Sequence, residues 1–279
     1  MTTARFEIPF DGATLVGESD GFGLPVVFLH AGVADRRMWA EQMQVVAEAG
    51  YHVIAYDRRG VGETNSADVP FSPVADLEAV LDGLSIHAAV LVGSSTGGGL
   101  ALDFAIENPE RTVGLVLVAT ALGGAPEPEL PEEAEALFDA RSYAEERGQW
   151  QGVNRIDAHL WLDGPTSQSG RVEGEARELF LAMNGKRLEV PALTQEEATD
   201  TAADNLAAVT APVLLVVGDL DFPHIVERHE ELDEDLDNAF AVLLEDTAHL
   251  PSLERPDLFD PLLLEFLDAI SGVGDPGDD

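Results

Sequence analysis

Short apolar runs recur along the chain and alternate with segments in which apolar residues follow a helical period. The apolar runs contain little polar alternation and lie at 25–29, 52–56, 89–92, 113–118, 213–217 and 240–244. Strands of this kind are buried on both faces, which is typical of a parallel sheet covered by helices on each side. The intervening pattern predicts helices at 38–48, 74–83, 98–107, 203–208, 223–232 and 256–269. The chain is therefore predicted to have an α/β fold.

The first residues follow a different pattern. Strand-like segments at 5–9 and 13–17 flank Asp11-Gly12, a dipeptide typical of a tight hairpin turn. We therefore expect an antiparallel hairpin before the first parallel strand.

Residues 125–195 interrupt the alternation of strands and helices, because they contain no strand candidate. After a proline-rich start they predict acidic amphipathic helices. We interpret this interval as a helical lid inserted between two strands, although a helical extension packed elsewhere would give the same pattern. The predicted organisation is an α/β core at 1–124 and 196–270, a lid at 125–195, and a disordered Gly- and Asp-rich tail at 271–279.

Composition excludes several classes of protein. The chain has 279 residues, of which 45% are hydrophobic, enough for one large α/β domain with an insertion. It has no cysteine, so disulfides, thiolate metal sites and a cysteine nucleophile are excluded. No apolar run reaches the about 18 residues of a membrane span, and no signal peptide is visible. We expect a cytoplasmic protein, monomer or homodimer, without metal or cofactor.

The charge is strongly one-sided, with 53 acidic residues against 15 basic ones and a formal net charge of −38. Nucleic acid and anionic membrane surfaces would be repelled. The acids are spread over most predicted helices and loops, which favours adaptation of the whole surface to high salt over an acidic face for one basic partner. The sequence therefore predicts a halophilic protein that loses its structure when salt is removed.

The segment from Gly93 to Gly97 carries the first candidate for chemistry. It reads G-x-S-x-G with Ser95 at its centre, follows the apolar run at 89–92, and precedes the helix predicted at 98–107. A sharp strand-to-helix turn would hold the serine hydroxyl exposed above the sheet, as in a nucleophile elbow. Because short Gly/Ser strings also occur in ordinary turns, a catalytic role requires a base and an acid in suitable places.

Candidates for the base and the acid follow predicted strands, since reactive groups of parallel sheets lie at the carboxyl ends of strands. Asp219 and Asp221 both follow the run at 213–217. We favour Asp221, which has more reach, because Asp219 lies inside the tight turn. His249 comes between the last strand and the last helix. The order Ser95, Asp221, His249 is the one that the elbow architecture requires.

The turn His30-Ala31-Gly32 after the first core strand can present backbone N–H groups towards Ser95. The backbone N–H groups of Gly32 and Thr96 are therefore candidates for an oxyanion hole. We expect His30 to brace this turn rather than to react. Other histidines are weaker candidates for the base than His249, because they lie in a predicted helix, before a strand or in the lid. They are His224, His229, His87 and His159.

Jointly, these motifs resemble the successive signatures of α/β-hydrolase-fold enzymes. They are His30-Ala31-Gly32, Asp57-Arg58-Arg59-Gly60-Val61-Gly62, Gly93 to Gly98, Gly218 to Asp221, and His249 with Pro251, Glu254 and Pro256. The stretch from Ala31 to Trp39 is similar to that of 3-oxoadipate enol-lactonases and related small-ester hydrolases. The chain departs from the family's usual residues at Ala31, Ser94, Thr96 and Ala248, and none of these changes removes a reacting group.

The resemblance and the serine nucleophile together imply a serine hydrolase that cleaves a small carboxylic ester or lactone through an acyl-enzyme. Serine at position 95 argues against the dehalogenase and epoxide hydrolase chemistry of related enzymes, which use aspartate there. The alternatives are a C–C bond hydrolase of ring-cleavage products, a cofactor-free haloperoxidase or acyltransferase, and a catalytically silent ligand-binding protein.

Two further groups of residues have more than one interpretation. Aromatic and sulfur side chains of the lid could line an apolar acyl pocket or form the core of the lid: Trp150, Trp161, Phe180 and Met183. Arg58 and Arg59, beside glycines, could form an anion site. In the family this segment is a structural turn beside the active site, which we favour.

Overall fold

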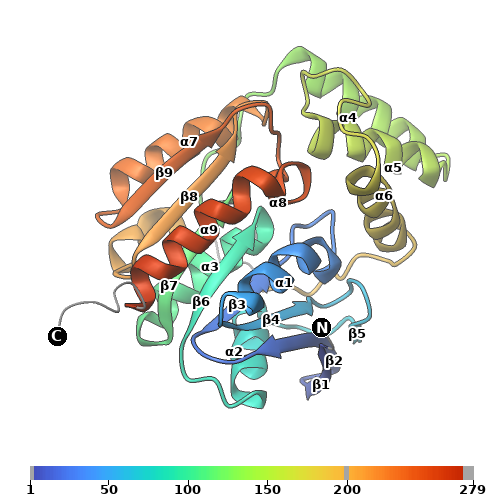
Figure 1. Cartoon of the computed structure of the whole chain (residues 1–279). Helices are drawn as coiled ribbons and strands as arrows, with labels where there is room; N and C mark the ends of the chain where they lie inside the picture. The colour runs from blue at the N-terminus through green and yellow to red at the C-terminus, as the bar shows by residue number, and fades with distance from the viewer. Residues whose placement is uncertain (1–2, 198–200, 273–279) are drawn as a thin grey trace.

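The structure is a computed structural model that describes residues 3–197 and 201–272. Its centre is a nine-stranded sheet in the order β1-β2-β4-β3-β6-β7-β8-β9, with β5 paired to β2 (Figure 1). The strands are β1 (Ala4–Phe10), β2 (Ala13–Gly21), β3 (Pro25–Leu29), β4 (His52–Asp57), β5 (Asn65–Ser66), β6 (Ala89–Ser94), β7 (Thr112–Val118), β8 (Val213–Gly218) and β9 (Ala239–Leu244).

The sheet is mostly parallel, as the apolar runs predicted. β1 and β2 form the expected antiparallel hairpin, and β2 also pairs antiparallel to β4. All pairings from β4 through β3, β6, β7 and β8 to β9 are parallel. The chain order reverses between β3 and β6, and ligand sites of open α/β sheets lie at such a reversal.

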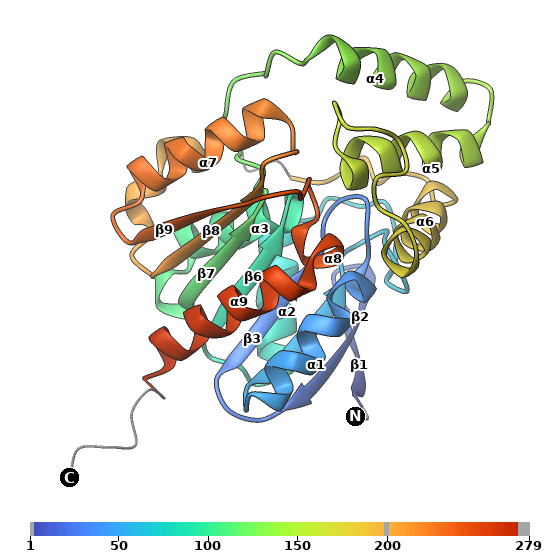
Figure 2. The same cartoon turned by 45° about the horizontal axis from the view of Figure 1, so that its top comes forward.

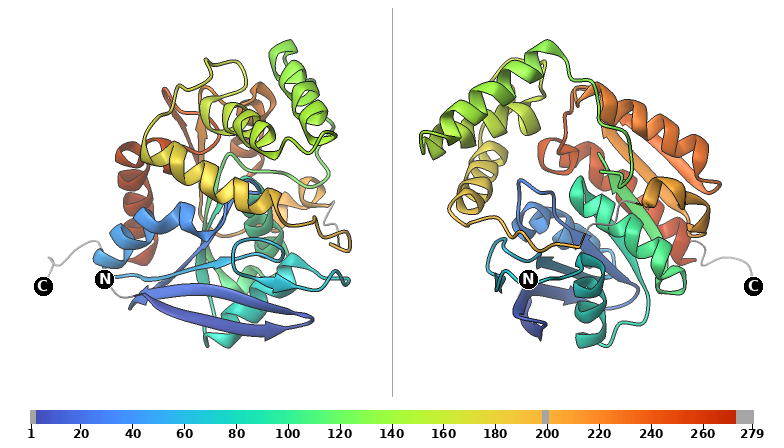
Figure 3. Two further views of the ribbon diagram at one scale, coloured as in Figure 1. Left: turned by 90° about the vertical axis from the view of Figure 1, so that its right-hand side faces the viewer. Right: turned by 180° about the vertical axis from the view of Figure 1, so that it is seen from behind.

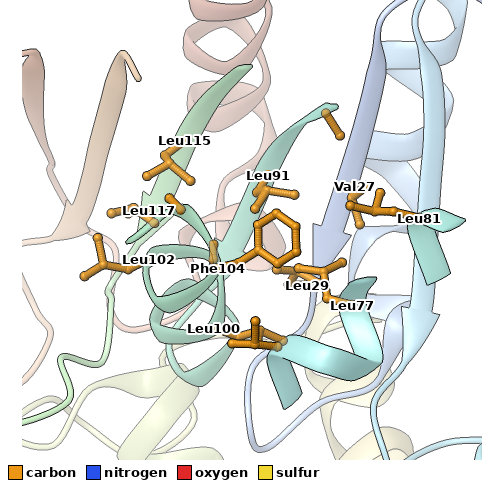
Figure 4. Close-up of a cluster of buried hydrophobic side chains, with 14 of the residues drawn as sticks. Val27, Leu29, Leu77, Leu81, Leu91, Leu100, Leu102, Phe104, Leu115 and Leu117 are labelled. Atoms are coloured by element: carbon orange, nitrogen blue, oxygen red, sulfur yellow. The ribbon is translucent and has the colours of Figure 1, made fainter. Parts of the chain in front are cut away.

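Helices cover both faces of the sheet because its strands are apolar on both faces. Val26 and Phe28 of β3 pack towards helices α1 (Ala40–Glu48) and α9 (Pro256–Ser271). Val27 and Leu29 pack towards α2 (Pro73–Gly83) and α3 (Thr96–Glu107) on the other face. Figure 4 shows the buried cluster that contains Val27 and Leu29, in which Phe104 of α3 lies among leucines of the strands and of the helices. The core helices are α1 (Ala40–Glu48), α2 (Pro73–Gly83), α3 (Thr96–Glu107), α7 (Pro223–Asp235), α8 (Pro251–Glu254) and α9 (Pro256–Ser271).

Three helices and a π-helical turn fill the long interval between β7 and β8. They lie together at one end of the sheet (Figures 2 and 3). These elements, here called the cap helices, are α4 (Glu132–Glu145), α5 (Trp150–Ala158), the π-helical turn (His159–Asp163) and α6 (Glu175–Leu188). Among the described residues, no helix combines the length and the apolar character that crossing a membrane requires.

Two predicted elements differ from the observed ones. The helix predicted at 203–208 is a pair of 3₁₀ turns, Ala202–Asp204 and Leu206–Ala208. The prediction that both faces of the last strand are covered is wrong: in β9, Phe240 is 65% and Leu243 54% exposed. The reason is that β9 forms the edge of the sheet, with β8 as its only neighbouring strand in the described sheet. Most of the tail expected to be disordered, from residue 273 on, lies outside the described residues.

A buried ion pair joins the loop after β4 to helix α2. Arg59 donates from Nε and Nη2 to the Asp76 carboxylate, both at 2.7 Å, and the side chains are 1% and 4% exposed. Removing one partner leaves an uncompensated buried charge, which costs about 3–5 kcal/mol. We expect Asp76→Asn to lower the free energy of unfolding by about that amount, measured by urea denaturation at constant salt. The control Asp257→Asn, in the exposed pair with Arg255, should leave the midpoint unchanged; equal midpoints for all three proteins would contradict the argument.

Candidate active site

Ser95 lies in the turn between β6 and α3, beside the point where the strand order reverses. Its backbone has φ 55° and ψ −117°, a strained conformation for a residue with a β carbon. Hydrogen bonds hold it there: Ser95 N donates to Val118 O at 2.8 Å, and Ser95 O accepts from Gly99 N at 3.0 Å and Ala121 N at 3.1 Å. The surrounding backbone therefore fixes the strained serine at the apex of the turn.

The glycines of the motif permit the close approach of strand and helix at this turn. A Cβ on Gly97 would lie 2.3 Å from Leu29 O, and a Cβ on Gly93 would lie 2.3 Å from Gly97 O. Neither separation is sterically possible, so any side chain at these positions would push α3 away from β3 and β6. The G-x-S-x-G spacing is thus required by the packing around Ser95.

Asp221 and His249 lie in the loops after β8 and β9 and are hydrogen-bonded to each other. His249 Nδ1 lies 2.8 Å from Asp221 Oδ2 and 3.1 Å from Oδ1, and both residues are buried. Asp221 Oδ1 also accepts from Phe222 N at 2.7 Å. The alternative acid, Asp219, is exposed at the start of the same loop. This arrangement lets the carboxylate hold Nδ1 of the imidazole in its protonated form.

One cavity of about 310 Å³ is lined by Ser95, His249, Gly32 and Thr96. Within the described residues, His249 Nε2 is buried and has no hydrogen-bond partner. With Nδ1 directed to Asp221, Nε2 is the nitrogen that can accept a proton. In unliganded sites the bond between base and nucleophile is often long and tightens only when substrate binds.

The turn that follows β3 lies against the residue after Ser95. A Cβ on Gly32 would lie 3.3 Å from Thr96 Oγ1. His30 braces this turn: Nδ1 donates to Ala31 O at 2.8 Å, and Nε2 accepts from Arg58 N at 3.1 Å. Burial lowers the pKa of His30 to about 3, so the ring is neutral near pH 7 and able to accept that bond.

Of the four aromatic and sulfur residues considered for a pocket, Trp161 lines the cavity. It lies in the π-helical turn, with its ring centroid 4.7 Å from that of His249 and 4.9 Å from that of Phe222. Trp150 is instead 46% exposed at the start of α5. Phe180 and Met183 are fully buried in the packing of α6 against the core and do not line this cavity.

Other residues of the cap helices also line the cavity, and no sequence pattern had indicated a place in the site for them. They are Phe138, Arg141, Ser142, Asp157 and Arg187. Asp157 is a buried carboxylate that pairs with Arg141 Nε at 2.6 Å and accepts from Asn184 Nδ2 at 2.8 Å. These residues come from α4, α5 and α6, and only the docking of the cap helices brings them beside Ser95. In the described part of the chain, no three His, Asp or Glu side chains are grouped as a metal site would require.

The chain is similar to several known proteins. A non-heme chloroperoxidase of Streptomyces lividans is 29% identical over 274 residues, which cover 88% of this chain and 92% of that one. An epoxide hydrolase of Caballeronia sordidicola is 36% identical over 112 residues, 38% of this chain and 34% of that enzyme. The solved structure of Est816, described as an N-acyl homoserine lactone degrading enzyme, superposes with a TM-score of 0.71 at 27% identity, covering 93% of this chain and 99% of the other.

A family model extends over most of the chain. It matches residues 26–261, a range that includes the turn after β3, the Ser95 elbow, Asp221, His249 and the whole interval of the cap helices. The fold, the order of its signature motifs and this match agree, and the chain belongs to the alpha/beta hydrolase family.

Proposed function

We propose that this hydrolase cleaves a small carboxylic ester or lactone, with Ser95 as nucleophile, His249 as base and Asp221 as the acid that orients the base. The observation that carries the proposal is that Ser95 and His249 line the same cavity. The buried Nε2 of His249 has no hydrogen-bond partner among the described residues, while Nδ1 is bound to Asp221.

The reaction divides into two acyl transfers. His249 Nε2 takes the Ser95 proton as Oγ attacks the ester carbonyl, and the resulting imidazolium, stabilised by Asp221, returns that proton to the departing alcohol oxygen. Water then loses a proton to Nε2 as it attacks the acyl-enzyme. When the acyl–oxygen bond breaks, Nε2 returns this proton to Ser95 Oγ, which releases the carboxylic acid and restores Ser95 and His249. A lactone follows the same route, and its alcohol and acid remain in one product.

Backbone N–H groups supply the oxyanion hole in this mechanism. Thr96 N is at the first position of α3, where backbone N–H groups have no intrahelical partner, and Gly32 lies beside Thr96. Loss of one such donor typically costs about 2.7–4 kcal/mol of transition-state stabilisation. The relative Est816, described as degrading N-acyl homoserine lactones, supports the lactone as one form of the substrate.

The test is covalent labelling followed by a substrate panel. We expect a fluorophosphonate probe to label the wild-type protein at Ser95, shown by peptide mass spectrometry in multimolar salt. A panel of p-nitrophenyl esters, lactones and dienone acids then separates ester, lactone and C–C bond hydrolysis. Absence of labelling, together with no turnover of any panel member, would exclude the proposed chemistry.

Haloperoxidase activity is the second candidate, because the Streptomyces lividans relative that matches nearly its full length is described as a non-heme chloroperoxidase. The distinguishing assay is bromination of monochlorodimedone with hydrogen peroxide, bromide and acetate. Bromination faster than hydrolysis of every ester in the panel would favour this activity.

Trp161 is expected to position the His249 ring. Its indole packs on the imidazole, and aromatic contacts of this kind contribute about 0.5–1.5 kcal/mol. We expect Trp161→Leu to lower kcat about 3- to 10-fold for a p-nitrophenyl ester, measured by steady-state kinetics. Trp150→Leu is the matched control, because Trp150 lies at the surface of the same helical region. An equal effect of the two substitutions would contradict a specific role for Trp161.

A further inference from the structure

A second cavity adjoins the one that contains Ser95 and His249. Its volume is about 290 Å³, and Gly32, Thr96 and Arg187 line both spaces. The two cavities therefore share a wall made of the turn after β3, the start of α3 and the cap helix α6. We call the second space the arginine cavity, because Arg58, Arg59 and Arg187 line it.

The three arginines differ in how their hydrogen-bonding capacity is used. Arg59 is satisfied by the Asp76 carboxylate and by backbone carbonyls. Arg58 donates from Nη2 to His30 O at 3.0 Å and to Thr96 Oγ1 at 2.8 Å, but its buried Nε has no partner in the described structure. The buried Nε of Arg187 is equally without a partner there. A buried donor left unpaired is costly and calls for an explanation.

Protein carboxylates do not satisfy these two arginines. Burial lowers the pKa of Arg58, and the nearby Tyr56 and Glu196 offset this only in part. Glu196 also lines the arginine cavity. Its side chain is exposed, and no ion pair with Arg58 or Arg187 is present among the described residues. Asp157, beside Arg187 in the first cavity, is bound to Arg141 and Asn184. Two arginines without a paired carboxylate, close to the proposed nucleophile, are unusual in a chain with 53 acidic residues.

We propose that Arg58 and Arg187 bind a carboxylate of the substrate, so that the ester or lactone cleaved at Ser95 is an anionic one. The inference rests on the proposed function and adds the class of substrate. A guanidinium presents a planar fork of donors that matches a carboxylate, and Arg58 Nη2 is already bonded to Thr96, the residue after the nucleophile. The carboxylate lies on a short chain that reaches from one cavity into the other.

The products follow from the same chemistry. If the carboxylate is on the acyl side, cleavage of the acyl–oxygen bond and addition of water release a dicarboxylate and a neutral alcohol. If it is on the alcohol side, the products are a simple acid and a hydroxy acid. The substrate is an anionic ester in both cases, and a pair of test substrates for each case distinguishes the two.

The experiment compares an anionic ester with its neutral isostere. The p-nitrophenyl monoester of glutarate carries a carboxylate where p-nitrophenyl 5-methylhexanoate carries an isopropyl group. We expect the wild-type kcat/KM to be at least 10-fold higher for the glutarate ester at fixed ionic strength. An acetyl ester of a hydroxy acid and its neutral isostere test the alcohol side. A ratio near one for both pairs would overturn the proposal.

Variants test the two arginines directly. We expect Arg187→Met to reduce the preference for the anionic ester about 10- to 100-fold, and Arg58→Met to act in the same direction. Arg155→Met is the matched control, since Arg155 is exposed on cap helix α5, and it should retain the wild-type preference. Circular dichroism checks that each variant is folded. A folded Arg187→Met protein with an unchanged preference would contradict the assignment.

A binding measurement separates this proposal from the proposed function. Calorimetry with glutarate on wild-type protein and on Arg187→Met requires no turnover. If Ser95 is labelled and neutral esters are hydrolysed but glutarate does not bind, the function stands and the carboxylate site is wrong. If no ester is hydrolysed and Ser95 is not labelled, glutarate binding that is lost in Arg187→Met supports the site alone.

Discussion

Replacing Ser95 by alanine is expected to lower kcat for the best ester of the panel by about 10⁴- to 10⁶-fold and to abolish fluorophosphonate labelling. In the proposed mechanism the substitution removes the atom that forms the acyl-enzyme, whereas the backbone geometry of the turn tolerates a methyl side chain as well as it tolerates serine. Stopped-flow and long-time steady-state assays together cover this range of rates. Intact-mass spectrometry reports the label.

Two comparisons make this result specific. The His249→Ala substitution should cost about as much as Ser95→Ala, and the double variant should be no worse, because the two groups act as one unit. Ser94→Ala is the matched control: Ser94 is buried next to Ser95 and its Oγ makes no hydrogen bond within the described structure, so its loss should leave activity and labelling intact. Residual labelling of the Ser95→Ala protein would show that another residue is the nucleophile.

Removal of salt is expected to unfold the protein. The formal net charge is −38, and carboxylates cluster on exposed helix faces. In α7 the exposed acids are Glu227, Glu230, Glu231, Asp233, Glu234 and Asp235. The Debye length falls from about 30 Å at 0.01 M to about 3 Å at 1 M salt, so multimolar salt suppresses a repulsion that acts over the whole surface at low salt.

The measurement is the midpoint of thermal unfolding by circular dichroism between 0.01 M and 3 M salt. We expect little or no folded protein at the lowest concentration and a midpoint that rises with salt. Sodium and potassium chloride at equal ionic strength should act alike if screening is the cause. A melting temperature that is the same at low and multimolar salt would contradict halophilic adaptation of this surface.

Most of the core could be predicted because its signals are local. The apolar runs predicted every parallel strand, since β-branched and aliphatic residues buried on both faces leave no polar alternation. The hairpin followed from Asp11-Gly12, where both residues have positive φ. The prediction for β9 failed because an edge strand and an inner strand can have the same apolar sequence, and only the position in the sheet decides how much of the strand is covered.

The candidate site was predictable in part for the same reason. The Ser95 turn needs glycines at fixed spacing, and the residues after β8 and β9 must lie at the carboxyl edge of the sheet. The cap contribution was not predictable. Trp150 and Trp161 have similar helical contexts in the sequence, yet one is largely exposed and the other packs on His249.

By itself, the sequence determined the parallel sheet, the strained serine turn and the order of Ser95, Asp221 and His249, because periodicity and turn geometry are written in neighbouring residues. Only the tertiary structure decided what surrounds that serine. The docking of the cap helices brings Trp161 onto His249, and it places Arg187 between the cavity of Ser95 and the cavity that Arg58 lines. Such contacts join residues far apart in the chain, and their formation depends on how whole helices pack rather than on any local pattern.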